Sequence, residues 1–327
     1  MYASLKRIGI KYIILGFLAA ISTSVIVVGA LILINSSFRK NSIFISSDST
    51  TTSNPTTLLS PTEKPNRVKI ILTGDVMLGR SVMIEAIEQE DPLFPFRKVA
   101  DVLREVDLVF INLENPIIKD CPRHVGGFTF CTTYEIAEGL TFSGVDVVNL
   151  ANNHSGNYGS YGINETINYL ERNEILATGV GKLVTKEVNG TNFGFLGFEY
   201  VFKPSDPEHL ELVKKSDSTV DILIVGVHWG DEYKDTANQF QRNLAREFIK
   251  NGADVVVGHH PHWVQDSEIV DGVPVYYSLG NFVFDQMWSE ETKKGAIVEL
   301  IFEDGKFIED RLIKTYIRER GQPEFVE

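Results

Sequence analysis

Short apolar runs rich in β-branched residues recur along the chain, and each run stops at a cluster of polar residues. The runs are VKIILTGD, DLVFINLE, VDVVNLANNH, DILIVGVHWG, ADVVVGHHPH and VPVYYSLGN, all between residues 68 and 281. Runs of this kind between turn signals predict buried strands. The stretches 160–173 and 236–252 predict amphipathic helices, and the C-terminal stretch 296–317 predicts a hairpin that turns at Asp304-Gly305. Because strands alternate with helices, we expect an α/β fold with helices on the faces of a sheet.

The polar residues that end these runs are the candidate site residues. In open α/β sheets, ligand sites form in the crevice beyond the carboxyl ends of the strands. The residues at such ends are Asp75, Glu114, Asn153, His154, His228, His259, His260 and His262. Together they would bring carboxylate, amide and imidazole groups to one edge, which is costly unless the groups pair or bind a metal. This donor set suits divalent ions such as Mn²⁺, Fe²⁺ or Zn²⁺.

Each of these residues also has a structural explanation when it is taken alone. Asp75, Asn152 or Asn153 could cap a turn. Glu114 precedes Asn-Pro and could begin a loop, and His228 could be a hydrogen-bonded core histidine beside Trp229. Only their common position at strand ends favours a functional site.

The N-terminal region contains an uncharged apolar stretch at residues 12–34. A stretch of about 20 residues is enough to cross a bilayer as a helix. Lys6, Arg7 and Lys11 precede the stretch, so the positive-inside rule places residues 1–11 in the cytoplasm and the remainder outside. The alternative is a cleaved signal peptide, whose apolar region is usually only about 7–15 residues long. The length therefore favours an uncleaved, single-pass membrane anchor.

Residues 35–66 are rich in Ser, Thr and Pro and predict a linker. The domain would then extend over residues 67–327, which carry 25 Lys and Arg against 42 Asp and Glu, a net charge of −17. Phosphate backbones are bound by basic surfaces, so this charge argues against nucleic acid as a partner.

The chain has two cysteines, Cys121 and Cys131, both outside the membrane in the expected topology. In an oxidising compartment they predict a disulfide that closes a short loop. A metal site made of two thiolates is the alternative, but neither a CxxC spacing nor a neighbouring Cys or His ligand supports it.

Six segments together resemble a known family. They are GDVMLGR (74–80), NLENP (112–116), NLANNH (149–154), VHWGDEY (227–233), GADVVVGHHPHWVQ (252–265) and YSLGNFVFD (277–285). In this order they are similar to the motifs of CapA-type proteins of poly-γ-glutamate capsule biosynthesis, whose domain resembles the calcineurin-like metallophosphoesterases. The resemblance covers nearly all of the stretch from Arg67 to Asp285. It implies a layered α/β/β/α sandwich, preceded here by the transmembrane helix, with a dinuclear metal site at the sheet edges.

Carried over residue by residue, the resemblance implies roles for the strand-end residues. The implied ligands of two divalent ions (Mn, Fe or Zn) are Asp75, Glu114, Asn153, His228, His260 and His262. Glu114 would bridge the metals, with Asp75 and His262 on the first and the other three ligands on the second. His154 would face the substrate as the catalytic acid. The residues left as further ligands, or as support for the ligands, are His259, Asn152 and Asn281.

Two positions depart from the family pattern. Asn157 stands where the family commonly has an aspartate after the Asn-His pair, and Cys131 stands where an arginine often follows a phenylalanine. A lost arginine removes a fixed positive charge for an anionic substrate. The departures therefore concern substrate recognition and turnover.

Two classes of function are compatible with these residues. A two-metal site favours hydrolysis, because the metals activate a water molecule and stabilise the developing charge. The bond would be a phosphoester, as the fold resemblance implies, or an amide, as the family's polymer implies. The alternative is a non-catalytic subunit that binds an anionic polymer through its metals and acts with capsule or polymer synthase subunits.

Overall fold

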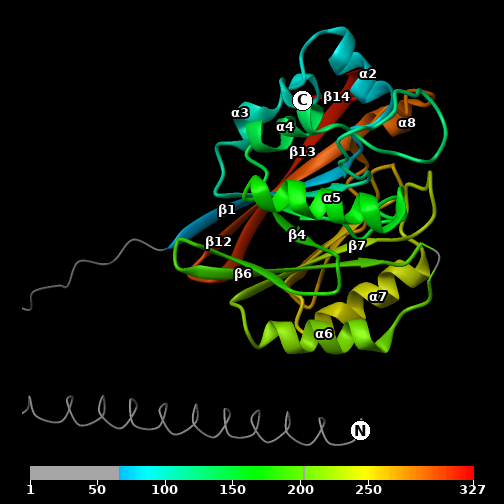
Figure 1. Cartoon of the computed structure of the whole chain (residues 1–327). Helices are drawn as coiled ribbons and strands as arrows, with labels where there is room; N and C mark the ends of the chain where they lie inside the picture. The colour runs from blue at the N-terminus through cyan, green and yellow to red at the C-terminus, as the bar shows by residue number, and fades with distance from the viewer. Residues whose placement is uncertain (1–65, 202) are drawn as a thin grey trace, which may run out of the picture. The chain divides into compact units, whose positions relative to one another are not determined.

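Two β-sheets packed face to face form the centre of the structure, a computed structural model that describes residues 66–201 and 203–327 (Figure 1). Three predicted segments lie outside the described residues: the cytoplasmic segment 1–11, the anchor 12–34 and the linker 35–66 except for its last residue, Asn66. Among the described residues, no helix is long and apolar enough to cross a membrane.

The first sheet has the strand order β14-β13-β12-β1-β2-β3-β4, with β11 paired to the end of β1. Strands β1 to β4 are parallel to one another, whereas β12, β13 and β14 are antiparallel to their neighbours. Its strands are β1 (Arg67–Val76), β2 (Leu108–Leu113), β3 (Val147–Asn149), β4 (Leu176–Thr178), β11 (Asn281–Val283), β12 (Lys294–Glu303), β13 (Lys306–Glu319) and β14 (Gln322–Phe325).

The second sheet has the order β5-β6-β7-β8-β10-β9. Its inner strands are parallel and its two edge strands antiparallel. Its strands are β5 (Val184–Val188), β6 (Thr191–Glu199), β7 (Ile222–His228), β8 (Val255–His259), β9 (Ser267–Val270) and β10 (Val273–Tyr276).

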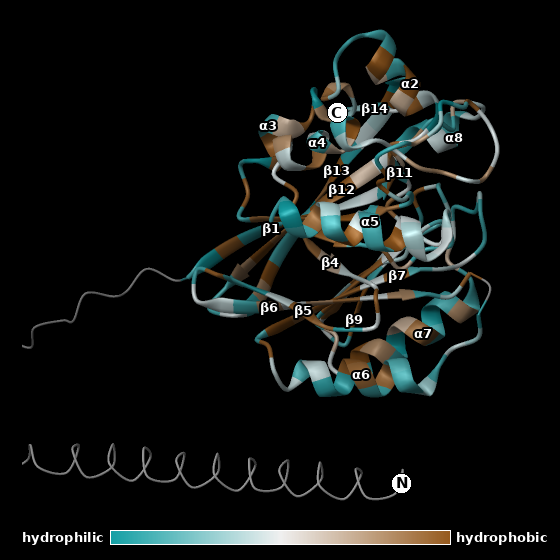
Figure 2. Ribbon diagram, in the orientation of Figure 1, coloured by the Kyte–Doolittle hydropathy of each residue, from teal (hydrophilic) through white to brown (hydrophobic). Residues whose placement is uncertain are grey.

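Helices cover the outer face of each sheet (Figure 1). The elements on the first sheet are α2 (Arg80–Glu88), the short 3-10 helix η1 (Phe94–Phe96), α3 (Ala100–Leu103), α4 (Tyr134–Phe142) and α5 (Gly159–Arg172). The helices on the second sheet are α6 (Pro207–Asp217) and α7 (Gln239–Lys250). A further short helix, α8 (Glu290–Lys293), precedes β12. Helices α5, α6 and α7 alternate between hydrophilic and hydrophobic residues (Figure 2), as helices with one solvent-facing side do.

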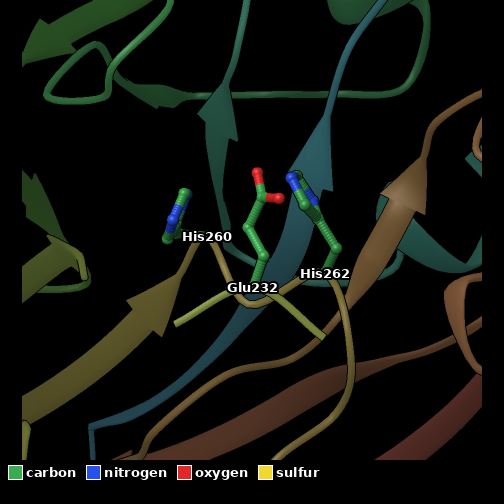
Figure 3. A group of neighbouring side chains, drawn as sticks. All are labelled: Glu232, His260 and His262. Carbon is green, nitrogen blue, oxygen red and sulfur yellow. The ribbon is translucent and has the colours of Figure 1, made fainter. Parts of the chain in front are cut away.

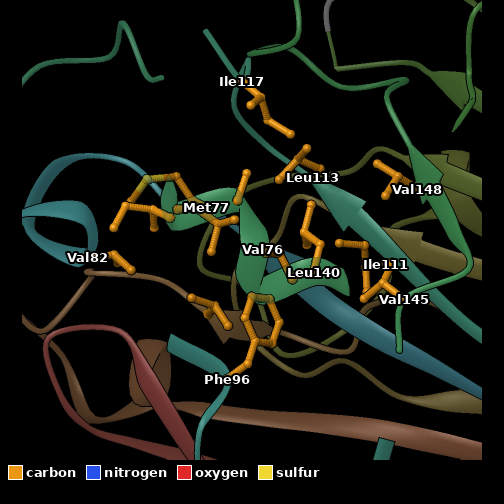
Figure 4. Packing of buried hydrophobic residues seen from close by; sticks show 14 of the residues in the cluster. Val76, Met77, Val82, Phe96, Ile111, Leu113, Ile117, Leu140, Val145 and Val148 are labelled. Atoms are coloured by element: carbon orange, nitrogen blue, oxygen red, sulfur yellow. The ribbon is translucent and has the colours of Figure 1, made fainter. Parts of the chain in front are cut away.

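Three buried clusters hold these layers together. The cluster between the sheets includes Leu72 and Phe110 from the first sheet and Phe195 and Ile224 from the second. A second cluster joins the first sheet to its helices (Figure 4), and a third joins the second sheet to α6 and α7. The layers are therefore helices, sheet, sheet and helices, which is the α/β sandwich expected from the sequence.

The strand runs seen in the sequence are uniformly apolar because the central strands are covered on both faces. Every residue of β2, β7 and β8 is buried. Parallel strands between two layers have this continuous pattern, whereas strands with one wet face alternate. The C-terminal hairpin is also confirmed. Its turn residues Asp304 and Gly305 have positive φ angles of 50° and 70°, which suit a tight turn between antiparallel strands.

The predicted disulfide is present. Cys121 and Cys131 are bonded, with 5.8 Å between their Cα atoms. The bond closes a loop beside the ends of β1 and β2, and loop closure of this length stabilises a fold by about 2–3 kcal/mol in the chain-entropy estimate. Cys131 is completely buried, so this end of the loop is part of the core.

Gly74 allows the end of β1 to approach the chain that leads into β11. A Cβ atom on Gly74 would lie 2.2 Å from the carbonyl oxygen of Gly280. The same carbonyl accepts the backbone N–H of Asp75 at 2.9 Å. The position of Asp75 therefore depends on the absence of a side chain at residue 74.

We expect Gly74→Ala to lower the free energy of unfolding by at least about 1–3 kcal/mol, the usual cost of overpacking. Gly126→Ala is the matched control, because a Cβ there meets nothing within 4 Å, and it should change stability by less than about 0.5 kcal/mol. Urea denaturation of both variants measures the difference. Equal midpoints for Gly74→Ala and Gly126→Ala would show that the backbone near Gly280 can move away from β1 to make room for a Cβ atom at residue 74 without loss of stability.

Candidate metal centre

The polar residues that end the central strands of both sheets lie along one edge of the sandwich. In the first sheet, Asp75 is in register with Asn112 of β2 and with Asn281 of β11. In the second sheet, His228 at the end of β7 is in register with His259 at the end of β8. The backbone N–H of His260 donates to the Asp75 carboxylate at 3.2 Å, which joins the two sheets at this edge.

One donor group is built around Asp75 and Glu114. Ligand atoms of Asp75, Glu114 and His262 lie within 4.8 Å of one another, and all three residues are buried. The Nδ1 atom of His262 is 3.3 Å from Asp75 Oδ2. On the other side, His228 Nε2 lies 3.7 Å from Glu114 Oε1 and 3.0 Å from Asn153 Oδ1. Glu114 thus lies between the imidazoles of His228 and His262, where a bridging ligand would be.

A second donor group contains a residue that the sequence analysis missed. Ligand atoms of Glu232, His260 and His262 also lie within 4.8 Å of one another (Figure 3). The ring of His260 is 4.9 Å from that of His228 and 5.9 Å from that of His262, measured between centroids. The signal for Glu232 was its place four residues after His228, within the motif VHWGDEY.

The backbone at His260 and His262 adopts an uncommon conformation. Both residues have positive φ angles, 98° and 58°. Such angles in non-glycine residues cost of order 1–3 kcal/mol and persist only where the surroundings enforce them. Here they turn both imidazoles into one buried site from a segment that has just left β8. Apolar and polar patterning contains no signal for this conformation.

Three buried polar atoms at the strand ends have no hydrogen-bond partner among the described residues. They are Glu114 Oε2, His259 Nδ1 and His260 Nδ1, and their residues are 0%, 1% and 5% exposed. A buried polar group without a partner is costly, and more so if it is charged. Carboxylate and imidazole donors left open in this way fit a divalent metal of the Mn, Fe or Zn type.

Burial and mutual charge set the protonation of the donors. Burial, followed by the negative charge of Asp75, raises the pKa of Glu114 well above its usual value. Burial also acts to raise the pKa of Asp75, but the hydrogen bond and charge of His262 hold it well below its ordinary range. Burial lowers the pKa of His260 to about 4 and that of His228 well below normal. Neutral imidazoles keep a lone pair for a metal, and a cation would offset the repulsion between the carboxylates.

Asn112 lies at the middle of the hydrogen bonds that support the ligands. Its Nδ2 donates to Asp75 Oδ1 at 2.9 Å and to Glu114 Oε1 at 3.3 Å. Its Oδ1 accepts from the amides of Asn149 and Asn152 at 3.2 and 3.3 Å. Asn152 therefore supports the site and is not in either donor group. The sequence analysis quoted NLENP but did not assign a role to its first residue.

Asn281 and His259 also hold other groups in place. Asn281 Oδ1 is 2.9 Å from Nδ1 of His262, and its amide donates to the carbonyl of Thr292 at 2.9 Å. His259 Nε2 is 3.1 Å from the carbonyl oxygen of Thr73, which can only accept. Among the described residues, His259 is in neither of the two donor groups. The sequence left these residues either as metal ligands or as support for the ligands, and their hydrogen bonds favour the supporting role.

His154 lies beside the donor groups, against the disulfide loop. Its ring stacks on Phe130 at 4.0 Å between centroids, and its Nδ1 is 3.2 Å from the carbonyl oxygen of Phe128. Because a carbonyl only accepts, Nδ1 carries the proton in the neutral ring. Burial lowers the pKa of His154 to about 4, with a hydrogen bond to Asn157 acting in the opposite direction. At neutral pH His154 is thus uncharged with Nε2 unprotonated, so it can donate from Nε2 only after protonation.

The two departures from the family pattern have structural counterparts here. The Oδ1 of Asn157 accepts the backbone N–H of Phe130 at 2.6 Å, so this residue holds the loop next to His154. Cys131 forms the disulfide. A nearby positive charge is supplied instead by Arg80, whose guanidinium lies 4.4 Å from the centroid of Phe130 and pairs with Asp285.

A cavity of about 450 Å³ lies next to the metal centre. Asn152 and Asn153 form part of its lining, together with Glu199, Lys203 and His209. The cavity thus joins two residues of the Asn-Asn-His segment to polar groups at and beyond the end of β6. A substrate group bound beside Asn153 has room to extend into it.

Comparisons with known proteins identify the family and support the fold. The PGA biosynthesis protein CapA of Bacillus subtilis (strain 168) is 33% identical over 253 residues, which cover 69% of this chain and 65% of that protein. The capsule biosynthesis protein CapA of Bacillus anthracis is 31% identical over 280 residues, covering 76% and 68%. The chain therefore spans about two thirds of the length of these relatives. The crystal structure of a novel phosphatase from Mycoplasma pneumoniae has the same fold, with a TM-score of 0.53 at 15% identity, covering 77% of this chain and 94% of that one.

The family model of the bacterial capsule synthesis protein PGA_cap matches residues 69–286. The matched range begins in β1, ends after β11 and contains both donor groups and the disulfide. The chain therefore belongs to the PGA_cap family of bacterial capsule synthesis proteins.

Proposed function

We propose that this protein acts in the biosynthesis of a capsule polymer as a membrane-anchored, extracytoplasmic hydrolase with two divalent metal ions. The bond it cleaves would be a phosphoester or an amide. The names of the two Bacillus relatives support the capsule polymer. The phosphatase fold supports hydrolysis, and the anchor is supported by the uncharged stretch 12–34.

The observation that carries the proposal is the set of buried donors at the strand ends. Asp75 and Glu114 are fully buried with His228 and His262 beside them, and Glu114 Oε2 has no partner in the described protein. In a purely structural network these groups would satisfy one another. The open lone pairs instead support two adjacent metals, with Glu114 between them.

In the proposed reaction, the protein's residues position the substrate and move its proton. Two bound metals would supply an activated water molecule and stabilise charge on the reacting oxygens. His154, which stacks on Phe130, would hydrogen-bond to the leaving group. An anionic substrate next to the ring would raise the pKa of His154, and the protonated ring could then donate from Nε2. Arg80 adds positive charge at the same rim.

The alternative is a non-catalytic subunit that binds the carboxylates of an anionic polymer through its metals. The observation that favours it is the environment of His154, whose pKa is lowered to about 4 and whose neighbour Asn157 is an amide in place of a carboxylate. Such an imidazole is a weak acid donor at neutral pH. In either case we expect polymer synthase subunits as partners.

The first test is the metal content of the purified full-length protein and its variants after exposure to Mn²⁺ or Zn²⁺. We expect two ions per chain in the wild type and in His124→Ala, a control histidine that binds carbonyls of its own loop. Glu114→Ala should lose both ions, because this carboxylate lies between the two sets of imidazoles. His262→Ala should lose mainly one ion. Elemental analysis measures all four proteins, and a wild type without any divalent metal rules out the dinuclear centre.

The second test separates the enzyme from the binding protein. His154→Ala should keep the metal content of the wild type. Its hydrolytic rate should fall by roughly 10²–10⁴-fold, which is the usual contribution of a positioned acid. The rate is measured with a chromogenic phosphodiester and with a γ-glutamyl polymer. If the metal-loaded wild type cleaves neither substrate but retains the polymer in a pull-down, the non-catalytic function is the correct one.

The third test concerns the anchor. The full-length protein should sediment with membranes, whereas a chain that begins at Arg67 should be soluble, because it lacks the apolar stretch 12–34. Cell fractionation with immunoblotting measures both. A full-length protein that is cut after residue 34 and recovered from the medium would show a signal peptide instead.

A further inference from the structure

The turn after β7 carries Glu232, a carboxylate without a role in the scheme proposed above. Its side chain projects between the imidazoles of His260 and His262 (Figure 3). Glu232 is exposed, whereas both histidines are buried. It therefore approaches the metal centre from the solvent side, opposite the fully buried Glu114.

The backbone on both sides of Glu232 is fixed to the segment that carries the histidines. The N–H of Trp229 donates to the carbonyl of His259 at 3.0 Å, and the N–H of Tyr233 donates to that of Pro261 at 2.8 Å. Trp229 is completely buried, and its indole N–H donates to the carbonyl of Tyr277 at 3.0 Å. The turn that contains Glu232 thus cannot move independently of the segment 259–262.

The turn itself has a shape that few sequences allow. Gly230 has a φ of 86°, and a Cβ atom there would lie 2.7 Å from the side chain of Gln241. Tyr233 also has a positive φ, 60°. An uncommon backbone at both ends of a short turn indicates that the position of the residues between them is enforced.

The two histidines beside Glu232 belong to different metal positions in the proposed function. His262 lies with Asp75, and His260 lies next to His228. A carboxylate within 4.8 Å of both imidazoles is therefore close to both positions. His260 also keeps a buried ring nitrogen, Nδ1, that has no partner in the part of the chain that the structure describes, so this face of the centre has an open donor of its own.

We propose that Glu232 is a second carboxylate ligand, which spans the two metal positions from the solvent-facing side and is displaced by the anionic group of the substrate. This inference rests on the dinuclear centre of the proposed function. With Asp75 and Glu114 as the buried carboxylates, Glu232 adds a third negative charge against two divalent ions. Its displacement by a substrate anion would leave the charge of the centre balanced, since one anion replaces another.

The test compares Glu232→Gln with Asp235→Asn in the full-length protein. Asp235 is also exposed, lies three residues further on, and bonds only to the neighbouring Thr236 hydroxyl among the hydrogen bonds seen here, at 3.2 Å. Both substitutions remove one negative charge and keep the side-chain shape. Thermal unfolding in EDTA should give the same midpoint for the wild type and both variants, which excludes misfolding as a cause.

The first measurement is a Mn²⁺ titration followed by the electron paramagnetic resonance signal of free Mn²⁺. We expect Glu232→Gln to weaken binding of at least one ion by about tenfold or more, the range seen when groups that support a metal are removed. Asp235→Asn should stay within about twofold of the wild type. If both variants bind two ions as tightly as the wild type, Glu232 is not a ligand, although the proposed function stands. A wild type that binds no Mn²⁺ overturns both.

The second measurement is the binding of inorganic phosphate at saturating Mn²⁺, by isothermal titration calorimetry. Glu232→Gln should bind phosphate more tightly than the wild type, because no charged ligand has to leave. Asp235→Asn should bind it as the wild type does. Weaker or unchanged binding by Glu232→Gln would show that the carboxylate is not displaced by the anion.

Discussion

The cost of burying charge at the edge of the two sheets is the constraint on which the rest of the structure depends. Asp75, Glu114 and His228 are each completely buried, and the groups nearest to the carboxylates are the other carboxylate and the imidazole rings of His228 and His262. Two ionised carboxylates so close together are unfavourable in a protein interior unless a cation is bound or one of them takes up a proton. The network around Asn112 offsets part of this cost by donating to both carboxylates. The remaining open lone pairs make this edge a candidate metal site.

The scaffold holds the donors by close approach of backbones. Gly258 at the end of β8 has no room for a side chain, because a Cβ there would lie 2.1 Å from the carbonyl of Tyr277 and 2.4 Å from the indole nitrogen of Trp229. These contacts fix β8, and hence His259 and His260, against the neighbouring strand. Gly74 fixes the end of β1 in the same way. Within each sheet, neighbouring segments are thus held close together where the candidate ligands begin.

Much of this fold could be predicted because its central strands are covered on both faces. Each such strand is an apolar run that ends at a polar residue. The run therefore predicts the strand, and the polar residue at its end is a candidate ligand. Asp75, Glu114, His228 and His260 were found in this way. Glu232 and Asn112 were not, since the first lies in a turn and the second lies inside a strand run. The positive φ angles of His260 and His262 leave no trace in the pattern of apolar and polar positions.

The origin of the donors in both sheets has a thermodynamic consequence. Asp75 and Glu114 lie at or just after the ends of strands of one sheet, whereas His228, His260 and His262 lie at or just after the ends of strands of the other. In the proposed dinuclear centre, ions held between these donors would act as cross-links across the sandwich. For ions that bind only the folded chain, a free concentration of one hundred times the dissociation constant adds about 2.7 kcal/mol to the stability of the native state. Folding and metal occupancy would then be coupled equilibria, so the free metal concentration would set the stability of the native state.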